Sequence, residues 1–247
     1  KDSEYVGNSD VSTMLHNREY HCISDLHLGV SLRSFRSEKL AIFVKCLLDE
    51  EIELARETYE ELKKSYPVLI TRKFDVAKNW VKKKARGTER YGLLASSEGK
   101  RLRAEGIWVP SEINHVGWFL NEKDNVDSSY YLEVAASEFK VQGLEIDYAV
   151  LAWDADLRYT SNGFDYFKFR GTKWNHVNQE QRQHYLKNAY RVLMTRARQG
   201  LIIYIPEGDE EDSSRLTEYY EGTYQYLKHV GIKEILKVGD EFEGFEV

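Results

Sequence analysis

Residues 137–148 read SEFKVQGLEIDY, and residues 190–204 read YRVLMTRARQGLIIY. The first run has the order of a strand, a tight glycine turn, a carboxylate and a second strand. The second run has an arginine-rich helix end, a glycine and a strand. Short apolar runs bounded by turn residues are typical of strands buried inside a sheet. We name these stretches the Gly143 run (137–148) and the Arg196 run (190–204), and we expect them to act as a pair.

The rest of the chain alternates between apolar strands and amphipathic helices. We expect strands at 67–71, 91–97, 148–153 and 200–205, with a further alternating pattern at 26–32. Helices are expected from Ser37 onward and at 98–105, 181–196 and 215–229. Two apolar stripes mark inner helix faces, namely Leu40, Phe43, Val44, Leu47 and Leu48, and Phe74, Ala77, Trp80 and Val81. This order predicts an α/β fold, a doubly wound and mostly parallel sheet with helices on both faces.

Domain boundaries follow from where this alternation is lost. Residues 1–20 are polar without a period, and we interpret them as a linker or a truncated N-terminal segment. Residues 21–247 are expected to form one domain. Two aromatic-rich stretches without a clear period, about 106–130 and 157–177, are interpreted as insertions or long loops within it. Because the sequence begins with Lys1 and not with methionine, we expect a piece of a longer protein.

Composition excludes several classes of protein. The chain has 247 residues, 13% aromatic residues and a net charge of -6, which is typical of a folded globular protein and argues against indiscriminate coating of DNA. It has no run of eighteen apolar residues, so we expect no membrane span. Cys22 and Cys46 have no metal-site spacing, and reduced thiols are expected. A cytoplasmic protein is the simplest interpretation.

The two runs together resemble the second RecA-like domain of superfamily 1 helicases, the UvrD/Rep-like group. Gln142-Gly143-Leu144-Glu145 is similar to motif V, and Val192-Leu193-Met194-Thr195-Arg196 is similar to motif VI. The similarity extends further to a family of uncharacterised bacterial, Schlafen-related helicase-like ATPases, in which Asn-x-Tyr-Arg-Val-Leu-x-Thr-Arg follows Phe-x-x-Gln-Gly-x-Glu-x-Asp. The resemblance covers roughly residues 26–205.

This resemblance implies a site for ATP between two domains. Arg196 would be the arginine finger of motif VI, because a guanidinium stays charged and spreads its charge over the transferring phosphoryl oxygens. Gln142 and Gly143 would form the turn beside the nucleotide, and Glu145 would accept a hydrogen bond from the ribose. The alternatives are a solvated basic helix end at Arg196, and a plain turn with a surface Glu145.

Residues 32–37 resemble motif IV, in which Phe35 would stack on adenine and Arg36 would reach the γ-phosphate. A structural arginine at a helix start is the alternative for Arg36. The Gly143 run departs from the UvrD-like pattern at Phe139, where many relatives carry a nucleic-acid-contacting histidine, and at Gln142, where many carry lysine. We therefore expect these departures to affect nucleic-acid contacts more than ATP contacts.

The chain contains no Gly-x-x-x-x-Gly-Lys-[Ser/Thr] phosphate loop and no strand ending in Asp-Glu. ATP and Mg²⁺ would therefore be held mainly by an N-terminal P-loop domain of the same protein, with no metal ligand in this chain, which alone should hydrolyse nothing. One alternative is a non-catalytic interaction domain. Another is a metallophosphoesterase, because Asp25 and His27 lie in a Ser-Asp-Leu-His-Leu-Gly match, but the further ligands of a two-metal site are missing.

A basic band runs from Arg72 to Arg103. Lys82, Lys83, Lys84 and Arg86 are candidate contacts to single-stranded DNA or RNA, since phosphates need only positive charges on a shared face. The same residues also fit the wet side of an amphipathic helix. Four tryptophans are either base-stacking or core residues, namely Trp80, Trp108, Trp118 and Trp174. Two acidic residues after a strand have an open role, Asp154 and Asp156.

Overall fold

The computed structural model describes the backbone of residues 35–240 and the side chains of residues 38–240. The predicted strand at 26–32, the segment 1–20, and the candidates Cys22, Asp25 and His27 lie outside the described residues. Within this range, no helix is long and apolar enough to cross a membrane.

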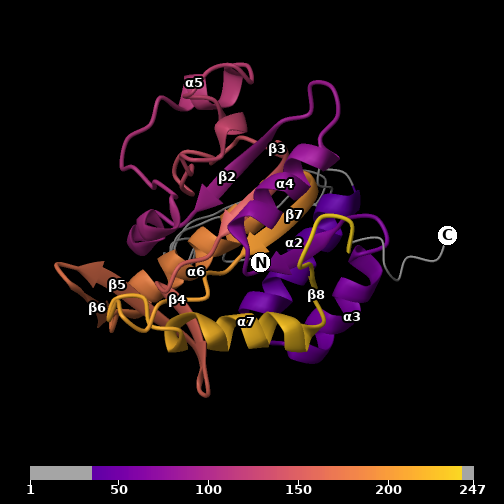
Figure 1. The fold of residues 1–247 in the computed structure, drawn as a ribbon. Coiled ribbons are helices and arrows are strands. Elements are labelled where there is room, and N and C mark those ends of the chain that lie inside the picture. Colours follow the sequence, from indigo (N-terminus) through magenta and orange to yellow (C-terminus); the bar gives the residue numbers. More distant parts are fainter. Residues whose placement is uncertain (1–34, 241–247) are drawn as a thin grey trace, which may run out of the picture. The chain divides into compact units, whose positions relative to one another are not determined.

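The fold is built on a five-stranded sheet whose strands all run in parallel (Figure 1). Its order is β2-β3-β7-β1-β8. The strands are β1 (Val68–Thr71), β2 (Tyr91–Ala95), β3 (Ile146–Ala152), β7 (Ala197–Tyr204) and β8 (Lys233–Glu234). Strands that are buried on both faces are near-continuous apolar runs. The predicted class, a mostly parallel α/β sheet, is confirmed.

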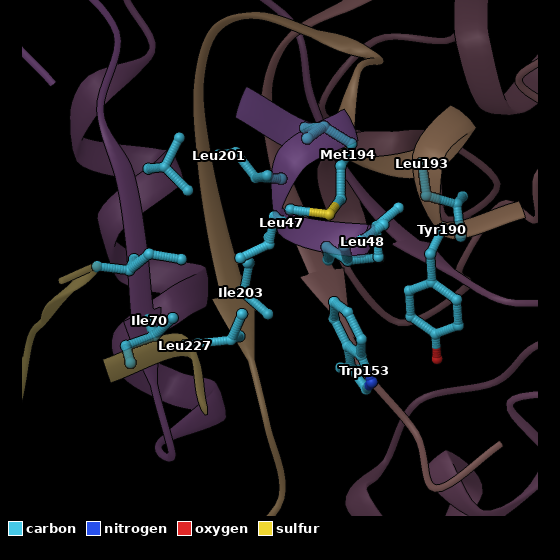
Figure 2. Packing of buried hydrophobic residues seen from close by; sticks show 14 of the residues in the cluster. Leu47, Leu48, Ile70, Trp153, Tyr190, Leu193, Met194, Leu201, Ile203 and Leu227 are labelled. Carbon is cyan, nitrogen blue, oxygen red and sulfur yellow. The ribbon is translucent and has the colours of Figure 1, made fainter. Parts of the chain in front are cut away.

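Successive residues of each strand enter two different cores, because side chains alternate across a sheet. Ile70, Leu151 and Ile203 point to one core, which also contains α2 (Phe35–Leu48), α3 (Ile52–Leu62), α6 (Glu180–Met194) and α7 (Glu218–Val230). Figure 2 shows part of this core, with residues of α2 and α6 packed beside residues of β7 and beside Trp153, which follows β3. The neighbouring Leu69, Val150 and Ile202 point to the other core.

The second core is covered by α4 (Phe74–Lys84) and the 3-10 helix η2 (Lys100–Glu105). Ala77, Trp80 and Val81 of α4 are fully buried against the sheet, as the helical spacing predicts. In place of the predicted helix at 98–105, the chain forms only the 3-10 helix η2, which begins after Gly99. Helices on both faces confirm the doubly wound arrangement.

Helix α2 has the predicted apolar stripe, and all five of its residues are buried. The helix ends at Leu48, and Glu50 has a positive φ of 65°, which turns the chain before α3 begins. A non-glycine residue in this conformation is uncommon. Helix α7 ends at Val230 and is capped by Gly231, whose φ of 102° lets its N–H bond to the carbonyls of Leu227 and Lys228.

Residues 157–177 are not a loop, so that expectation was wrong. They form an antiparallel three-stranded sheet of β4 (Leu157–Thr160), β5 (Gly163–Arg170) and β6 (Lys173–His176). The physical reason is two tight hairpin connections, Ser161-Asn162 before Gly163 and Gly171-Thr172 before β6, and both glycines have positive φ. Asn-Gly between strands is a strong hairpin signal. The aromatic residues of this stretch are therefore cross-strand neighbours.

Residues 106–130 contain more structure than a plain loop. They include α5 (His115–Leu120), and the 3-10 helix η3 (Ser129–Tyr131) follows at their end. Trp118 of α5 is buried, and its indole N–H donates to the carbonyl of Val134 at 3.1 Å. Trp108 forms an isolated parallel bridge with Val134. This segment packs onto the β2 side of the sheet, because Trp118 lies against Gly92.

Candidate functional site

The Gly143 run and the Arg196 run meet at the amino-terminal edge of the sheet. β3 and β7 are neighbours in parallel register, with Ile146 opposite Ala197. The backbone N–H of Ile146 donates to the carbonyl of Arg196 at 3.0 Å. Glu145 and Arg196, which precede this paired position, are thus brought side by side from segments 51 residues apart. The sheet register therefore unites the predicted motif V and motif VI residues.

The turn of the Gly143 run presents its tip to solvent. Gln142 and Gly143 are exposed, while Glu145 is half-buried. Gly143 has a φ of 82°, and a Cβ added there would meet no atom within 4 Å. The glycine is therefore required by the left-handed backbone and not by crowding. Space for an incoming molecule is left above the turn.

Arg196 lies back over the last turn of its own helix. The side chain is 8% exposed, and its Nε donates to the carbonyl of Val192 at 3.1 Å. A terminal nitrogen is 3.5 Å from the Thr195 hydroxyl. The last carbonyls of a helix need such donors, and they carry partial negative charge. In this arrangement the guanidinium stabilises the end of α6 and does not extend from the sheet edge, so its role as a finger stays a prediction.

A second arginine of the same run forms an ion pair that sequence reasoning missed. Arg198 is 2.8 Å from the carboxylate of Asp147, whose side chain is 9% exposed. The same carboxylate accepts from the N–H of Arg90 at 2.7 Å and from the Gln199 amide at 3.1 Å. Asp147 thus ties the first residues of β2, β3 and β7 together. The signal was present, since Asp147 and Arg198 lie two residues after Glu145 and Arg196, respectively.

Arg191 is held elsewhere. It contacts Asn188 on its own helix and reaches Asp49 at 3.5 Å, and Lys187 contacts the same Asp49 at 2.7 Å. These contacts join α6 to the residue after α2. Arg191 therefore bridges α6 and the end of α2.

Phe35 and Arg36 are the first two residues of α2. Their side chains lie outside the described residues, so their predicted roles with ATP stay predictions. Helix α2 packs with α6 in one core, which places the two helices that carry the motif IV and motif VI candidates on the same face of the sheet. The structure brings together Gln142, Gly143, Glu145 and Arg196. That Phe35 and Arg36 of motif IV join this group stays a prediction.

The basic candidates lie on the opposite face. Lys82, Lys83 and Lys84 form the last turn of α4, and Arg86 follows two residues later. Lys82, Lys83 and Arg86 are exposed, and cations in the last turn of a helix complement its dipole. Lys82 also lines a hollow of about 380 Å³. Their predicted contact with nucleic acid stays a prediction.

The tryptophan candidates divide between core and surface. Trp80 and Trp118 are buried, so the core interpretation holds for them. Trp108 is exposed. Trp174 is half-buried in β6 and donates to the carbonyl of Ser214 at 2.8 Å.

The two acidic residues after β3 lie inside the protein, at the carboxyl edge of the sheet. Asp154 accepts hydrogen bonds from the N–H groups of Arg101 and Ala155 and from the Tyr220 hydroxyl. Asp156 accepts from the Tyr190 hydroxyl at 2.6 Å. Burial, and then repulsion by Asp154, raise the pKa of Asp156 to about 8. Asp156 is therefore protonated at neutral pH, and the pair is a buried polar link between β3, α6 and α7.

Comparisons with known proteins can now be set beside this geometry. No curated protein sequence matches the chain significantly. Among solved structures, the C-terminal domain of a possible DNA helicase from Lactobacillus plantarum WCFS1 is similar over 77% of this chain and 92% of that one, with 13% sequence identity and a TM-score of 0.32. That similarity is too distant to inform the site. The model of the Schlafen group 3, DNA/RNA helicase domain family matches residues 1–207. The chain belongs to this family.

Proposed function

We propose that this chain is the C-terminal half of a helicase-like, nucleic-acid-dependent ATPase. It would supply residues to ATP and Mg²⁺ held mainly on an N-terminal P-loop domain of the same protein. The observation that carries the proposal is the hydrogen bond from Ile146 to the Arg196 carbonyl, which brings Glu145 and Arg196 to one edge of the sheet. Membership of a helicase domain family supports the class of the whole protein.

The chemistry assigned to Arg196 requires a change of partner. Its guanidinium donates to a neutral carbonyl and lies near a neutral hydroxyl in this structure. Hydrogen bonds to ionised acceptors are roughly twice as strong as those between neutral groups, so a γ-phosphate at the sheet edge would compete with the Val192 carbonyl and the Thr195 hydroxyl for these donors. Glu145 would accept from the ribose hydroxyl and the exposed turn at Gly143 would let the nucleotide approach. Phe35 and Arg36 complete the proposed set by resemblance.

The test is ATP hydrolysis by the full-length protein, with and without single-stranded DNA. We expect Arg196→Ala to lower kcat by about 10³-fold, the lower end of the range for arginine fingers. Arg196→Lys should recover little of this loss, because lysine lacks the planar fork. Arg103→Ala, at an exposed arginine of η2, is the matched control and should leave turnover unchanged. This chain alone should hydrolyse nothing.

A second candidate is a non-catalytic interaction domain. It is favoured by one observation, the burial of Arg196 against its own helix. The same assay separates the two functions. Unchanged turnover in a folded Arg196→Ala protein would reject the finger and leave the interaction domain as the better account.

A further inference from the structure

A groove of about 1050 Å³ lies between three segments that are far apart in the sequence. One wall is the β5–β6 hairpin, the floor follows α6 from Arg182 to Val192, and the other wall contains Ser97 with part of the Gly143 run. Its volume is at the upper limit of pockets for small ligands, about 300–1,000 Å³. The groove is therefore large enough for part of a polymer.

The charged side chains in the groove leave an excess of positive charge. Lys168 and Glu98 neutralise each other in an ion pair. The carboxylate of Glu138 accepts from the N–H and the hydroxyl of Ser97, at 2.9 and 2.7 Å. Two further lining residues, Arg170 and Arg182, are exposed, and within residues 38–240 neither side chain forms an ion pair. Two available guanidinium groups in a chain with a net charge of -6 favour a ligand with phosphates.

The groove also presents aromatic rings to water. Phe139 is 72% exposed and Tyr185 is 60% exposed. Stacking of a base on an aromatic side chain contributes about 1–3 kcal/mol. Side-chain amides, which donate and accept hydrogen bonds as base edges do, line the space around these rings: Gln142, Asn175, Asn178, Gln179 and Asn188.

We propose that this groove binds a single strand of nucleic acid, with Arg170 and Arg182 on the phosphates and Phe139 and Tyr185 against unpaired bases. Only an unpaired strand fits this set, because the base faces of a duplex are stacked on one another. The proposal deepens the proposed function and rests on it for the class of ligand. It replaces Lys82, Lys83, Lys84 and Arg86 as the principal contact, since these lie on the opposite face of the sheet.

The experiment measures fluorescence anisotropy of labelled oligonucleotides of about twelve nucleotides, within the usual site size, with the 247-residue chain and no ATP. Oligodeoxyuridylate, oligouridylate and a blunt DNA duplex are the three probes, and the two single strands differ only in the sugar. We expect either single strand to bind at least about tenfold more tightly than the duplex, and the stronger of the two identifies the sugar. Phe139→Ala and Tyr185→Ala should each weaken single-strand binding by about 5- to 150-fold.

The charge reversal Arg170→Glu with Arg182→Glu should abolish binding, and the double alanine variant should reduce the salt slope by about 1.4, or about 0.7 per lost phosphate contact. Tyr131→Ala and Lys83→Glu with Arg86→Glu are controls outside the groove and should bind as the original chain does. Far-ultraviolet circular dichroism checks that each variant is folded.

Three results would overturn the proposal. They are unchanged binding in the groove variants, loss of binding in the Lys83/Arg86 control instead, and displacement of the strand by excess ATP, which would make the groove a nucleotide pocket. ATP hydrolysis by the full-length Arg196→Ala protein, measured without nucleic acid, tests the proposed ATPase function independently of the groove. A failure of the groove therefore remains distinguishable from a failure of the proposed ATPase function.

Discussion

Replacing Asp156 with asparagine should change how stability depends on pH. Asp156 is fully buried, its pKa is raised to about 8 by burial and by Asp154, and its neighbours are Tyr190 and Ser96. In the unfolded chain its pKa is about 3.9. The folded state thus holds a proton that the unfolded state releases, so stability falls as pH rises from about 4 to about 8. Burial also raises the pKa of Asp154, and the three hydrogen bonds that its carboxylate accepts oppose this rise.

The magnitude follows from this difference in proton binding. Between pH 5 and 7 one proton is taken up on folding, so this single group lowers the free energy of unfolding by about 1.4 kcal/mol per pH unit, or about 2.7 kcal/mol in total. Asparagine resembles the protonated carboxyl and can still accept from the Tyr190 hydroxyl, but it does not titrate. Asp156→Asn should therefore lose this part of the pH dependence.

The assay is urea unfolding followed by tryptophan fluorescence at pH 5, 6 and 7. The difference in stability between Asp156→Asn and the original chain should grow by about 1.4 kcal/mol for each pH unit. Asp124→Asn, at an exposed acid, should run parallel to the original chain. If the Asp156→Asn curve were also parallel, Asp156 would be ionised in the folded protein and the reasoning would fail.

Substitutions at four positions test packing and backbone, each by chemical denaturation. Asp147→Ala should cost about 1–3 kcal/mol, because the partly buried N–H of Arg90 loses its acceptor. Arg198→Ala should cost less than about 1 kcal/mol, since that side chain is 57% exposed. Equal costs for the two variants would contradict this division. Gly143→Ala should cost about 1–2 kcal/mol for its φ of 82° alone, with Gly143→Asn milder. Gly222→Ala should cost at least about 3 kcal/mol, because the new Cβ would lie 2.0 Å from the carbonyl oxygen of Tyr159, and a mild effect would show that α7 can move.

Local patterns predicted the central fold well. The stripe of α2 and the inner face of α4 have helical spacing, and β1, β3 and β7 are apolar runs, so each element is specified by residues near in the sequence. The sheet β4–β6 was missed because its aromatic residues showed no strict alternation. The Asn162-Gly163 connection was the signal that would have found it.

The candidate site was harder to predict, because its geometry depends on tertiary contacts. The sequence motifs indicated that Glu145 and Arg196 belong together, and the β3–β7 register brings them together. The Asp147–Arg198 pair and the burial of Asp156 depend on neighbours more than 30 residues away. The Arg196 side chain folds back onto the end of its own helix, a rotamer choice that the motif does not specify. Arg170 lies in the misread hairpin, which is why the groove had no counterpart in the sequence analysis.

Helix α6 has 15 residues and is thus about 22 Å long. Its exposed flank lines the groove as far as Val192, and the carbonyl of the same Val192 accepts from Arg196. In the two proposals made above, α6 would have a nucleic-acid strand along its side and a phosphate-binding arginine just beyond its C-terminal end. A small tilt of α6 would change the groove and the surroundings of Arg196 together. By thermodynamic linkage, a ligand bound at either site would then change the affinity of the other site. Binding of a strand in the groove would weaken or strengthen the hydrogen bond between Val192 and Arg196. Movement of Arg196 toward a phosphate would in turn change the affinity of the groove for the strand.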